Sequence, residues 1–463
     1  MRASLAAVLL ALATPAVAGV AITGNEIVQG FTPGLAVTGL LPNERVRVHS
    51  LRMFAVWQEQ PGKGWRPAPR AIHAWADYRA DAKGEMRLDA MSPLAGTFSG
   101  IDPYGMLWSG QPVGADGDPY LPEGVDAAKL AENESRILVS RGGKLLATAK
   151  LTSRPPLGLV EQEVAEGRLN GAFAAPADGL RHPALILLHG SEGASRSAAK
   201  DMARRFAGQG YAAFAFNYFA WDLSKIEGIP NAHVNQPIEM LAKVRDWLAK
   251  RPEADVTRLG LYGHSKGAEY AELAATRLPW IDAVVACVPT DVVWEGYGIG
   301  DGRNKPDPNA KEPAQYSSFS WRGRPLNYIP LKGDRKRFHS NTDFYEFKRK
   351  QMGAGAAAAA IPVERSRASF LFLGGGRDEV WNSGAMAQNL DKRMRAAGKA
   401  SDSEMVVYER AGHAICGEGV YPIRVWQNDS PDPRDPDLDA NGRATVDAWN
   451  RTKEFFERRL KSR

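Results

Sequence analysis

Residues 263–267 read Gly-His-Ser-Lys-Gly, and this G-x-S-x-G stretch decides the fold. It follows an apolar run at residues 259–262 and precedes a helix-like run at residues 268–275. A serine between a strand and a helix in this pattern is typical of a nucleophile elbow, a strained turn that raises the hydroxyl above a sheet. The pentapeptide alone occurs by chance in many proteins, so the flanking strand and helix are what make Ser265 a candidate nucleophile.

The partners of such a serine follow in the order acid and then histidine, each just after a strand. Asp378 lies in a glycine-rich turn after the hydrophobic run at residues 370–373, and His413 follows the next such run. A hydrogen-bonded imidazole must take the serine proton, and a carboxylate fixes the imidazole tautomer. We therefore expect Ser265, Asp378 and His413 to be nucleophile, acid and base. Glu379 is the rival acid, but Asp378 lies nearer the strand end.

A developing oxyanion needs two backbone N–H donors. One is expected from Lys266, the residue after the nucleophile, and the second from the loop at residues 189–193, which follows an earlier apolar strand. Within this loop either Ser191 or Glu192 is the donor, and the sequence does not choose between them. The histidines of the loop and of the elbow are expected to shape the pocket or its backbone.

Around the elbow, residues 155–463 alternate between strand-like and helix-like runs, which predicts a mostly parallel sheet with flanking helices, an α/β hydrolase. Residues 293–365 are irregular and rich in aromatic and charged side chains, and we expect them to form a cap-like insertion over the active-site face. Helices are predicted at residues 238–250 and 446–460. Buried strands are predicted at residues 184–188, 212–217, 258–262, 283–288, 369–373 and 405–409.

Residues 19–154 show short runs of alternating apolar and polar residues separated by turn signals, with no long helical period. This pattern predicts a β-sandwich domain. Residues 153–158, Ser-Arg-Pro-Pro-Leu-Gly, are the expected linker between the two domains. The clearest strand-like runs are residues 44–49, 74–79 and 136–140, with turns expected at residues 83–84 and 142–143.

Residues 1–18 have the pattern of a signal peptide. Arg2 supplies a positive start, residues 5–13 form an apolar run, and Ala16-Val17-Ala18 fits the small-x-small cleavage rule. The run is too short for the roughly 20 residues that span a bilayer, so a membrane anchor is the weaker interpretation. We expect a periplasmic or secreted protein that starts near Gly19 and has no stable membrane insertion.

The chain has two cysteines, Cys287 and Cys416. An exported protein could pair them, because disulfides persist outside the cytoplasm. A large core needs no disulfide framework, so we expect two small buried thiols in preference to a bridge.

Charge and composition narrow the class of partner. The 463 residues carry 59 basic and 53 acidic side chains, a net charge of +6 spread along the sequence, with no basic run interleaved with aromatics. Nucleic-acid binding therefore has little support.

Residues 437–442 resemble the start of a calcium-binding loop, but the twelfth position of that loop is Ala448, where a glutamate is expected. We expect an ordinary acidic loop there and no metal or cofactor; the sequence does not set an oligomeric state.

Motifs spread over the whole chain resemble a known family. In the first domain they are Tyr-Arg-Ala-Asp at 78–81, Gly-Glu at 84–85 and Gly-Ile-Asp-Pro-Tyr-Gly-Met-Leu-Trp at 100–108. In the second they are the elbow, Ile-Pro-Val-Glu-Arg at 361–365, Phe-Leu-Phe-Leu at 370–373, Asp378 with Trp381, Gly412-His413 and Val-Asp-Ala-Trp at 446–449. The chain thereby resembles the acyl-CoA thioesterases and bile acid-CoA:amino acid N-acyltransferases.

This resemblance implies an immunoglobulin-like β-sandwich joined to an α/β-hydrolase domain. The family's nucleophile, acid and base fall on Ser265, Asp378 and His413. Serine at the nucleophile position resembles the hydrolytic members, whereas members with cysteine there include the amino-acid conjugating enzymes. The implied activity is hydrolysis of a small acyl thioester or carboxylic ester through an acyl-Ser265 intermediate. There are two alternatives. One is an acyltransferase that uses an amine or alcohol as the acceptor, and the other is a non-catalytic exported binding protein.

Overall fold

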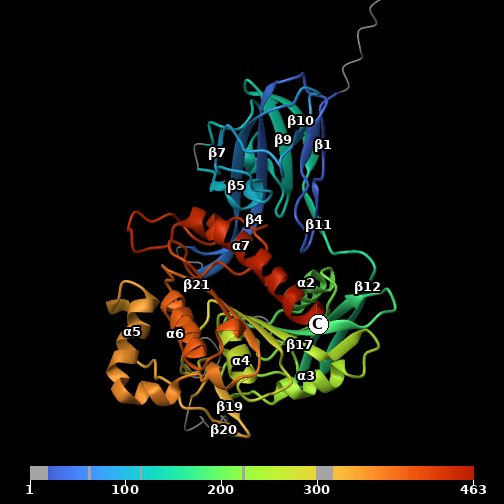
Figure 1. Ribbon diagram of the computed structural model, residues 1–463. Coiled ribbons are helices and arrows are strands. Elements are labelled where there is room, and N and C mark those ends of the chain that lie inside the picture. Colours follow the sequence, from blue (N-terminus) through green and yellow to red (C-terminus); the bar gives the residue numbers. More distant parts are fainter. Residues whose placement is uncertain (1–18, 61–63, 115–116, 222–224, 299–315, 463) are drawn as a thin grey trace, which may run out of the picture.

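The computed structural model, drawn in Figure 1, describes residues 19–60, 64–114, 117–221, 225–298 and 316–462. A β-rich domain stands on an α/β domain, and helix α7 (Leu438–Phe456) runs where the two meet. The fold class is therefore as predicted: an immunoglobulin-like β-sandwich followed by an α/β hydrolase. The predicted signal peptide at residues 1–18 lies outside the described residues.

The first domain packs two antiparallel sheets around one core. Its larger sheet has the order β10-β9-β4-β5-β7, and β1, β3 and β6 form the facing sheet. Buried Val37, Val48, Tyr78, Trp108 and Val139 fill the space between the sheets. The strands are β1 Ala21–Thr23, β2 Glu26–Val28, β3 Ala36–Thr38, β4 Arg45–Gln60, β5 Gly64–Arg79, β6 Met86–Arg87, β7 Ala95–Gly96, β8 Gln111–Pro112, β9 Ser135–Arg141, β10 Lys144–Lys150 and β11 Thr152–Arg154, with the short helix α1 Gly105–Trp108 and a 3₁₀ turn at Ala127–Lys129.

Two features of this domain differ from expectation. The strands β4 and β5 are 16 residues long, well beyond the predicted runs, because they pair with each other along their whole length. The start of the expected linker is a strand, since β11 pairs in parallel with β2.

The second domain is built on an eight-stranded sheet of order β12-β13-β15-β14-β17-β18-β21-β22. The strands from β15 to β22 in this order are parallel, whereas β12 and β13 form an antiparallel edge. All six predicted strands are present, but β22 is only partly buried, against the expectation of a buried strand. The β12–β13 hairpin was not predicted. The strands are β12 Leu159–Glu166, β13 Leu169–Pro176, β14 His182–Leu188, β15 Ala212–Phe216, β17 Ala254–His264, β18 Ala283–Cys287, β21 Ser369–Gly375 and β22 Ser403–Tyr408.

Helices cover both faces of this sheet. One face carries α3 (Met240–Leu248), α4 (Lys266–Ala275) and α6 (Ser383–Ala396), and the other carries α2 (Arg196–Ala207) and α7. The helix α7 begins at Leu438, eight residues before the predicted start at 446. Its N-cap is Asp437, whose carboxylate accepts the amide of Ala440. The expectation of an acidic loop at residues 437–442 is therefore wrong, because this aspartate begins a helix.

The described part of residues 293–365 is a mixture of short elements. They are β19 Phe319–Trp321, β20 Arg324–Pro325, helix α5 Asn341–Met352 and 3₁₀ turns at Arg335–Arg337, Gly353–Ala359 and Val363–Arg365; β19 pairs with β16, Gln236–Pro237. A hydrophobic cluster that includes Trp294, Phe344, Tyr345 and Trp381 ties α5 to the loop that follows β21. Figure 1 shows α5 beside α6 at one edge of the domain.

Cys287 and Cys416 form a disulfide, so the expectation of two free thiols is wrong. Cys287 ends β18, and Cys416 follows His413 in the loop after β22. The fold brings their Cα atoms to 6.0 Å although they are 129 residues apart in sequence. That distance is set by tertiary structure, which spacing in the sequence does not reveal.

The two domains share hydrogen bonds through the loop after His413. Arg52 on β4 donates to the carbonyl of Val420, and Arg70 on β5 donates to that of Val425.

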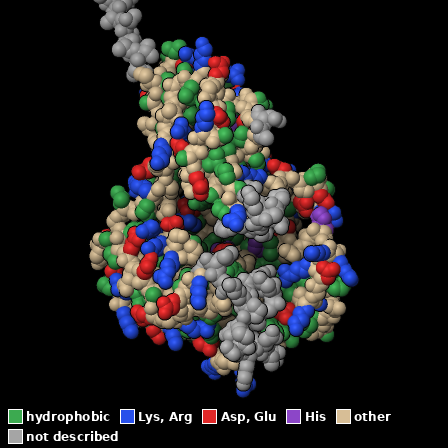
Figure 2. Space-filling view, turned by 180° about the vertical axis from the view of Figure 1, so that it is seen from behind, with side chains coloured by type: hydrophobic (Ala, Val, Ile, Leu, Met, Phe, Trp, Pro, Cys, Tyr) green, Lys and Arg blue, Asp and Glu red, His purple; other side chains and the backbone are tan. Residues whose placement is uncertain are grey.

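On the face shown in Figure 2, basic and acidic side chains are interspersed over the larger domain. Within the described residues, no helix is both long and apolar enough to cross a membrane.

Candidate active site

The elbow lies between β17 and α4. Ser265 has φ 54° and ψ −121°, an uncommon conformation for a residue with a side chain, which a nucleophile elbow requires. Two glycines permit it: a Cβ on Gly263 would lie 2.1 Å from the carbonyl oxygen of Gly267, and one on Gly267 would lie 2.2 Å from that of Leu188. The sequence therefore forces the sharp turn through close backbone packing.

The predicted triad residues meet in a hydrogen-bonded chain. Nε2 of His413 lies 3.0 Å from Oγ of Ser265, and Nδ1 of His413 lies 2.8 Å from Oδ2 of Asp378. Ser265 and Asp378 are each buried, with 6% and 5% of their surfaces exposed. With Asp378 accepting the Nδ1 proton, the lone pair of Nε2 faces the serine hydroxyl, which is the polarity that proton transfer from Ser265 needs.

Several neighbours hold the carboxylate of Asp378. Its Oδ1 accepts the amides of Val380 and Trp381 at 2.9 and 3.1 Å, and its Oδ2 accepts the hydroxyl of Ser383. The hydroxyl of Thr342 on α5 donates to the Asp378 carbonyl. The bonds to Oδ1 and Oδ2 fix the direction of the carboxylate toward His413, and the Thr342 bond holds the backbone that carries it.

Glu379, the rival acid, accepts a hydrogen bond from the backbone of His413, whereas the His413 ring is hydrogen-bonded to Asp378. Its Oε2 accepts the His413 amide at 3.0 Å, and its Oε1 accepts the side-chain amide of Gln427 at 2.9 Å. Burial, with the charge of Asp378 adding to it, raises the pKa of Glu379. The arrangement favours Asp378 as the acid and makes Glu379 a support for the loop that carries His413.

The pKa of His413 results from opposing effects. Burial lowers it, but the charge of Asp378 and its hydrogen bond outweigh burial, so that the pKa lies above the ordinary 6.5. A basic imidazole is suited to taking the proton from a serine.

The expected oxyanion-hole donors lie on two neighbouring elements. The amide of Lys266 is in the first turn of α4, where N–H groups have no intrahelical acceptor. Within the described part of the chain, the amide of Ser191 also has no acceptor, whereas the amide of Glu192 interacts with its own carboxylate.

The side chains of the expected donors have separate partners. The Glu192 carboxylate accepts the Gly190 amide and the Nε2–H of His264, both at 2.9 Å. Burial alone would raise the pKa of Glu192, but the charge and hydrogen bond of His264 lower it to about 2. Glu192 thus ties the loop to the elbow.

The Lys266 side chain is buried beneath the elbow. Its ammonium donates to Oε2 of Glu269 at 2.7 Å and to Oγ of Ser318 at 2.8 Å. Burial lowers the pKa of Lys266 and raises that of Glu269, while each charge opposes the shift of the other. Ser318 belongs to the insertion, so this group connects the first turn of α4 to it.

The sequence reasoning named the triad and the donor loop, considered Glu379 as the rival acid and expected His264 to shape the pocket or its backbone. It missed Ser383, whose position five residues after Asp378 was a usable signal. Thr342 and Ser318 come from the irregular insertion, where no pattern marked them.

Two family models match the chain. Residues 34–131 match the model described as "Acyl-CoA thioester hydrolase/BAAT N-terminal region", and residues 237–417 match "BAAT / Acyl-CoA thioester hydrolase C terminal". The second range includes the whole triad.

Several acyl-coenzyme A thioesterases are similar to this chain over nearly its full length. Mitochondrial acyl-coenzyme A thioesterase 2 of Mus musculus is 28% identical over 445 residues, covering 93% of this chain and 86% of the relative. Acyl-coenzyme A thioesterase 5 of the same organism is 28% identical over 446 residues, covering 92% and 93%.

Among solved structures, a putative dienelactone hydrolase from Klebsiella pneumoniae has a TM-score of 0.39 and 18% identity, over 64% of this chain and 98% of that one. Esterase B from a Lactobacillus has a TM-score of 0.37 and 15% identity, over 67% and 88%. Structural similarities this distant carry no functional argument. The family of the chain is assigned from the family models, and its candidate site from the geometry of Ser265, Asp378 and His413.

Proposed function

The chain belongs to the family of acyl-CoA thioester hydrolases and bile acid-CoA:amino acid N-acyltransferases, and from this premise we propose that it is a serine hydrolase of acyl thioesters or carboxylic esters. The observation that carries the proposal is the continuous hydrogen-bonded chain from Ser265 through His413 to Asp378 at a strained elbow.

The first step is attack of Ser265 Oγ on the acyl carbonyl carbon. His413 Nε2 takes the hydroxyl proton as the new C–O bond forms, and Asp378 stabilises the imidazolium. The carbonyl oxygen becomes an oxyanion, which the amide of Lys266 and one amide of the loop at Ser191 and Glu192 would stabilise. Removing one such donor typically costs about 10²–10³ in turnover.

Collapse of this intermediate breaks the bond to the leaving group. His413 returns its proton to the departing thiolate or alkoxide, which leaves the acyl group on Ser265. Water then enters, gives its proton to His413 and releases the carboxylic acid. The free serine is regenerated when the imidazolium proton returns to Oγ.

Water is the proposed acyl acceptor. The nucleophile is a serine, which matches the hydrolytic members of the family. The same curated relatives are named as thioesterases. Acyl transfer to another acceptor would require a bound amine or alcohol, and no observation in the described residues favours one.

Export is part of the proposal. The pattern of Arg2 and residues 5–18 supports it, and so does the bond between Cys287 and Cys416, because disulfides persist in oxidising compartments. In such a compartment coenzyme A thioesters are scarce, so an ester or another acyl donor available there is the proposed natural substrate.

A matched substrate panel tests the function. Purified mature protein is assayed with acyl-CoAs and with p-nitrophenyl esters of the same chain lengths, with Ser265→Ala as the background. We expect turnover of at least one series and a loss of about 10⁶-fold in Ser265→Ala, as for removal of a triad nucleophile. Equal rates in the two proteins would refute the proposal.

A further inference from the structure

The β-sandwich contains a second hydrogen-bonded chain of polar side chains, far from the triad. It begins at Ser140 on β9, whose Oγ lies 2.8 Å from Nε2 of His49 on β4. Nδ1 of His49 lies 3.0 Å from Nε2 of His73 on β5, and Nδ1 of His73 lies 2.7 Å from Oδ2 of Asp118. Ser140, His49 and His73 are buried, with 3%, 0% and 1% of their surfaces exposed.

The direction of these bonds follows from the carboxylate at the end. Asp118 accepts the Nδ1 proton of His73, so in a neutral ring the Nε2 of His73 must accept the Nδ1 proton of His49. The Nε2 of His49 then accepts the hydroxyl proton of Ser140. Burial, and next the neighbouring His73, lower the pKa of His49 to about 3, which keeps its ring neutral. The lone pairs of Ser140 Oγ are left for a further donor.

Such a donor would come from outside, because Ser140 lines a cavity. The cavity has a volume of about 370 Å³ and includes Arg45, Arg47, Tyr120 and Arg141 in its wall. This volume is within the range of about 300–1,000 Å³ that is usual for small-molecule sites. One end of the network, Ser140, therefore lies in the wall of this cavity.

The cavity wall is basic. Both carboxylate oxygens of Asp77 are used by Arg47, at 2.7 and 3.0 Å, and Arg141 pairs with Glu44. Arg45 is exposed and has no ion-pair partner among the residues that the structure describes. The surplus positive charge at Arg45 suits a carboxylate.

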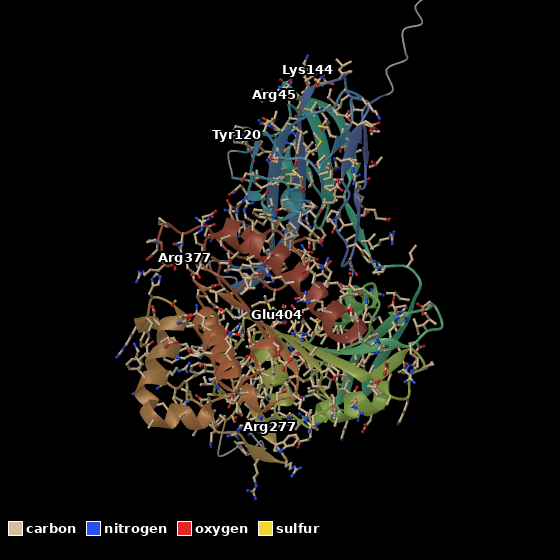
Figure 3. All side chains as sticks on the ribbon, viewed as in Figure 1. Arg45, Tyr120, Lys144, Arg277, Arg377 and Glu404 are labelled. Carbon is tan, nitrogen blue, oxygen red and sulfur yellow. A yellow bond between two sulfur atoms is a disulfide. The ribbon has the colours of Figure 1, made fainter. Side chains whose placement is uncertain are left out.

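The wall also presents an aromatic stack. Tyr120 lies against Trp75 with ring centroids 4.5 Å apart, and the guanidinium of Arg47 lies 4.0 Å from the Trp75 ring centroid. Tyr120 is 48% exposed, which leaves part of its ring free for an apolar ligand face. Figure 3 shows Arg45 and Tyr120 in the part of the sandwich that lies away from the hydrolase domain.

We propose that this cavity is a binding site for an acidic sugar unit. Its carboxylate would be bound by Arg45, with Arg141 beside it, and one of its hydroxyls would donate to Ser140. The apolar face of the sugar ring would contact Tyr120. The sandwich would then be a recognition domain for an acidic carbohydrate, either free or as one unit of a polymer, in addition to its packing against the hydrolase domain.

The test is titration calorimetry on the whole mature chain. The probes are galacturonate, galactose, inorganic phosphate and a short oligogalacturonate. Galacturonate should bind at least tenfold more tightly than galactose, because galactose lacks the carboxylate. It should also bind at least tenfold more tightly than phosphate, because phosphate lacks the sugar ring and its hydroxyls. Tighter binding of the oligomer would identify a polymer as the source, and equal binding per unit would identify the free sugar acid.

The matched variants are Arg45→Ala, Ser140→Ala and the control Lys144→Ala. Lys144 lies at the same end of the sandwich (Figure 3) but does not line the cavity. Its substitution by alanine removes one positive charge, as Arg45→Ala does. Arg45→Ala and Ser140→Ala should each weaken galacturonate binding about tenfold or more, and Lys144→Ala should not change it. Arg45 is exposed, so its variant is informative even if Ser140→Ala unfolds. Absence of galacturonate binding, phosphate binding of equal strength, or an equal loss in Lys144→Ala would overturn the proposal.

Discussion

Replacing Asp378 by asparagine should abolish most of the activity while leaving the fold intact. The amides of Val380 and Trp381 both donate to Oδ1, so the asparagine carbonyl oxygen must take that position. Its NH₂ group then occupies the Oδ2 position, 2.8 Å from Nδ1 of His413, and donates to that nitrogen. The ring proton is driven to Nε2, which faces Ser265 and is then unable to accept the serine proton.

The magnitude follows from this wrong tautomer. The same change in a serine protease lowers turnover by about 10⁴-fold, which at about 1.36 kcal/mol per factor of ten is roughly 5.4 kcal/mol of transition-state stabilisation. Glu379→Gln is the matched control, since glutamine keeps an acceptor for the His413 amide, and we expect a loss of less than about tenfold because only a supporting hydrogen bond is altered. Initial rates on a p-nitrophenyl ester, with thermal unfolding as a check of folding, compare the two. If Glu379→Gln is the more damaging change, the acid is Glu379 and the tautomer argument fails.

Three further outcomes are expected. Because His413 must be neutral to accept a proton and its pKa is raised, kcat/KM should fall as the pH falls through a value above 6.5; an acid limb below 6.5 would contradict the role of Asp378. Reducing the Cys287–Cys416 bond, which joins residues 129 apart, should lower the free energy of unfolding by about 2–5 kcal/mol; a Tm that is the same with and without reductant would show that the bond does not stabilise the fold. N-terminal sequencing of protein from the fractionated native host should find Gly19 first, and an intact Met1 in the cytosolic fraction would exclude export and restore acyl-CoA as the leading substrate.

The meeting of Ser265, Asp378 and His413 could be predicted because each residue comes within a few positions of the end of a strand in the parallel sheet, and these strand ends lie at the same edge of the sheet. The apolar runs within β14, β17 and β21 were found because the buried parts of parallel strands have continuous hydrophobic sequences. The hairpin of β12 and β13 was missed because β12 is a partly exposed edge strand with many polar residues.

Other features depend on contacts between distant parts of the chain. Cys416 reaches Cys287 only after β18 and the loop beyond β22 are in place. Thr342 reaches the backbone of Asp378 from an irregular insertion, and the chain from Ser140 to Asp118 assembles across three neighbouring strands and a loop. No local pattern encodes these pairings. The start of α7 was missed for a different reason, because its N-cap aspartate lies in an acidic stretch that was interpreted as a loop.

The central claim is that Ser265 is the nucleophile, and covalent labelling tests it most directly. The folded protein is treated with a fluorophosphonate, which reacts with an activated serine, and the adduct is located by peptide mass spectrometry. We expect one adduct, on the peptide that contains Ser265, and none in Ser265→Ala or, on the same time scale, in His413→Ala. An adduct on a different serine, or undiminished ester hydrolysis by Ser265→Ala, would contradict the account.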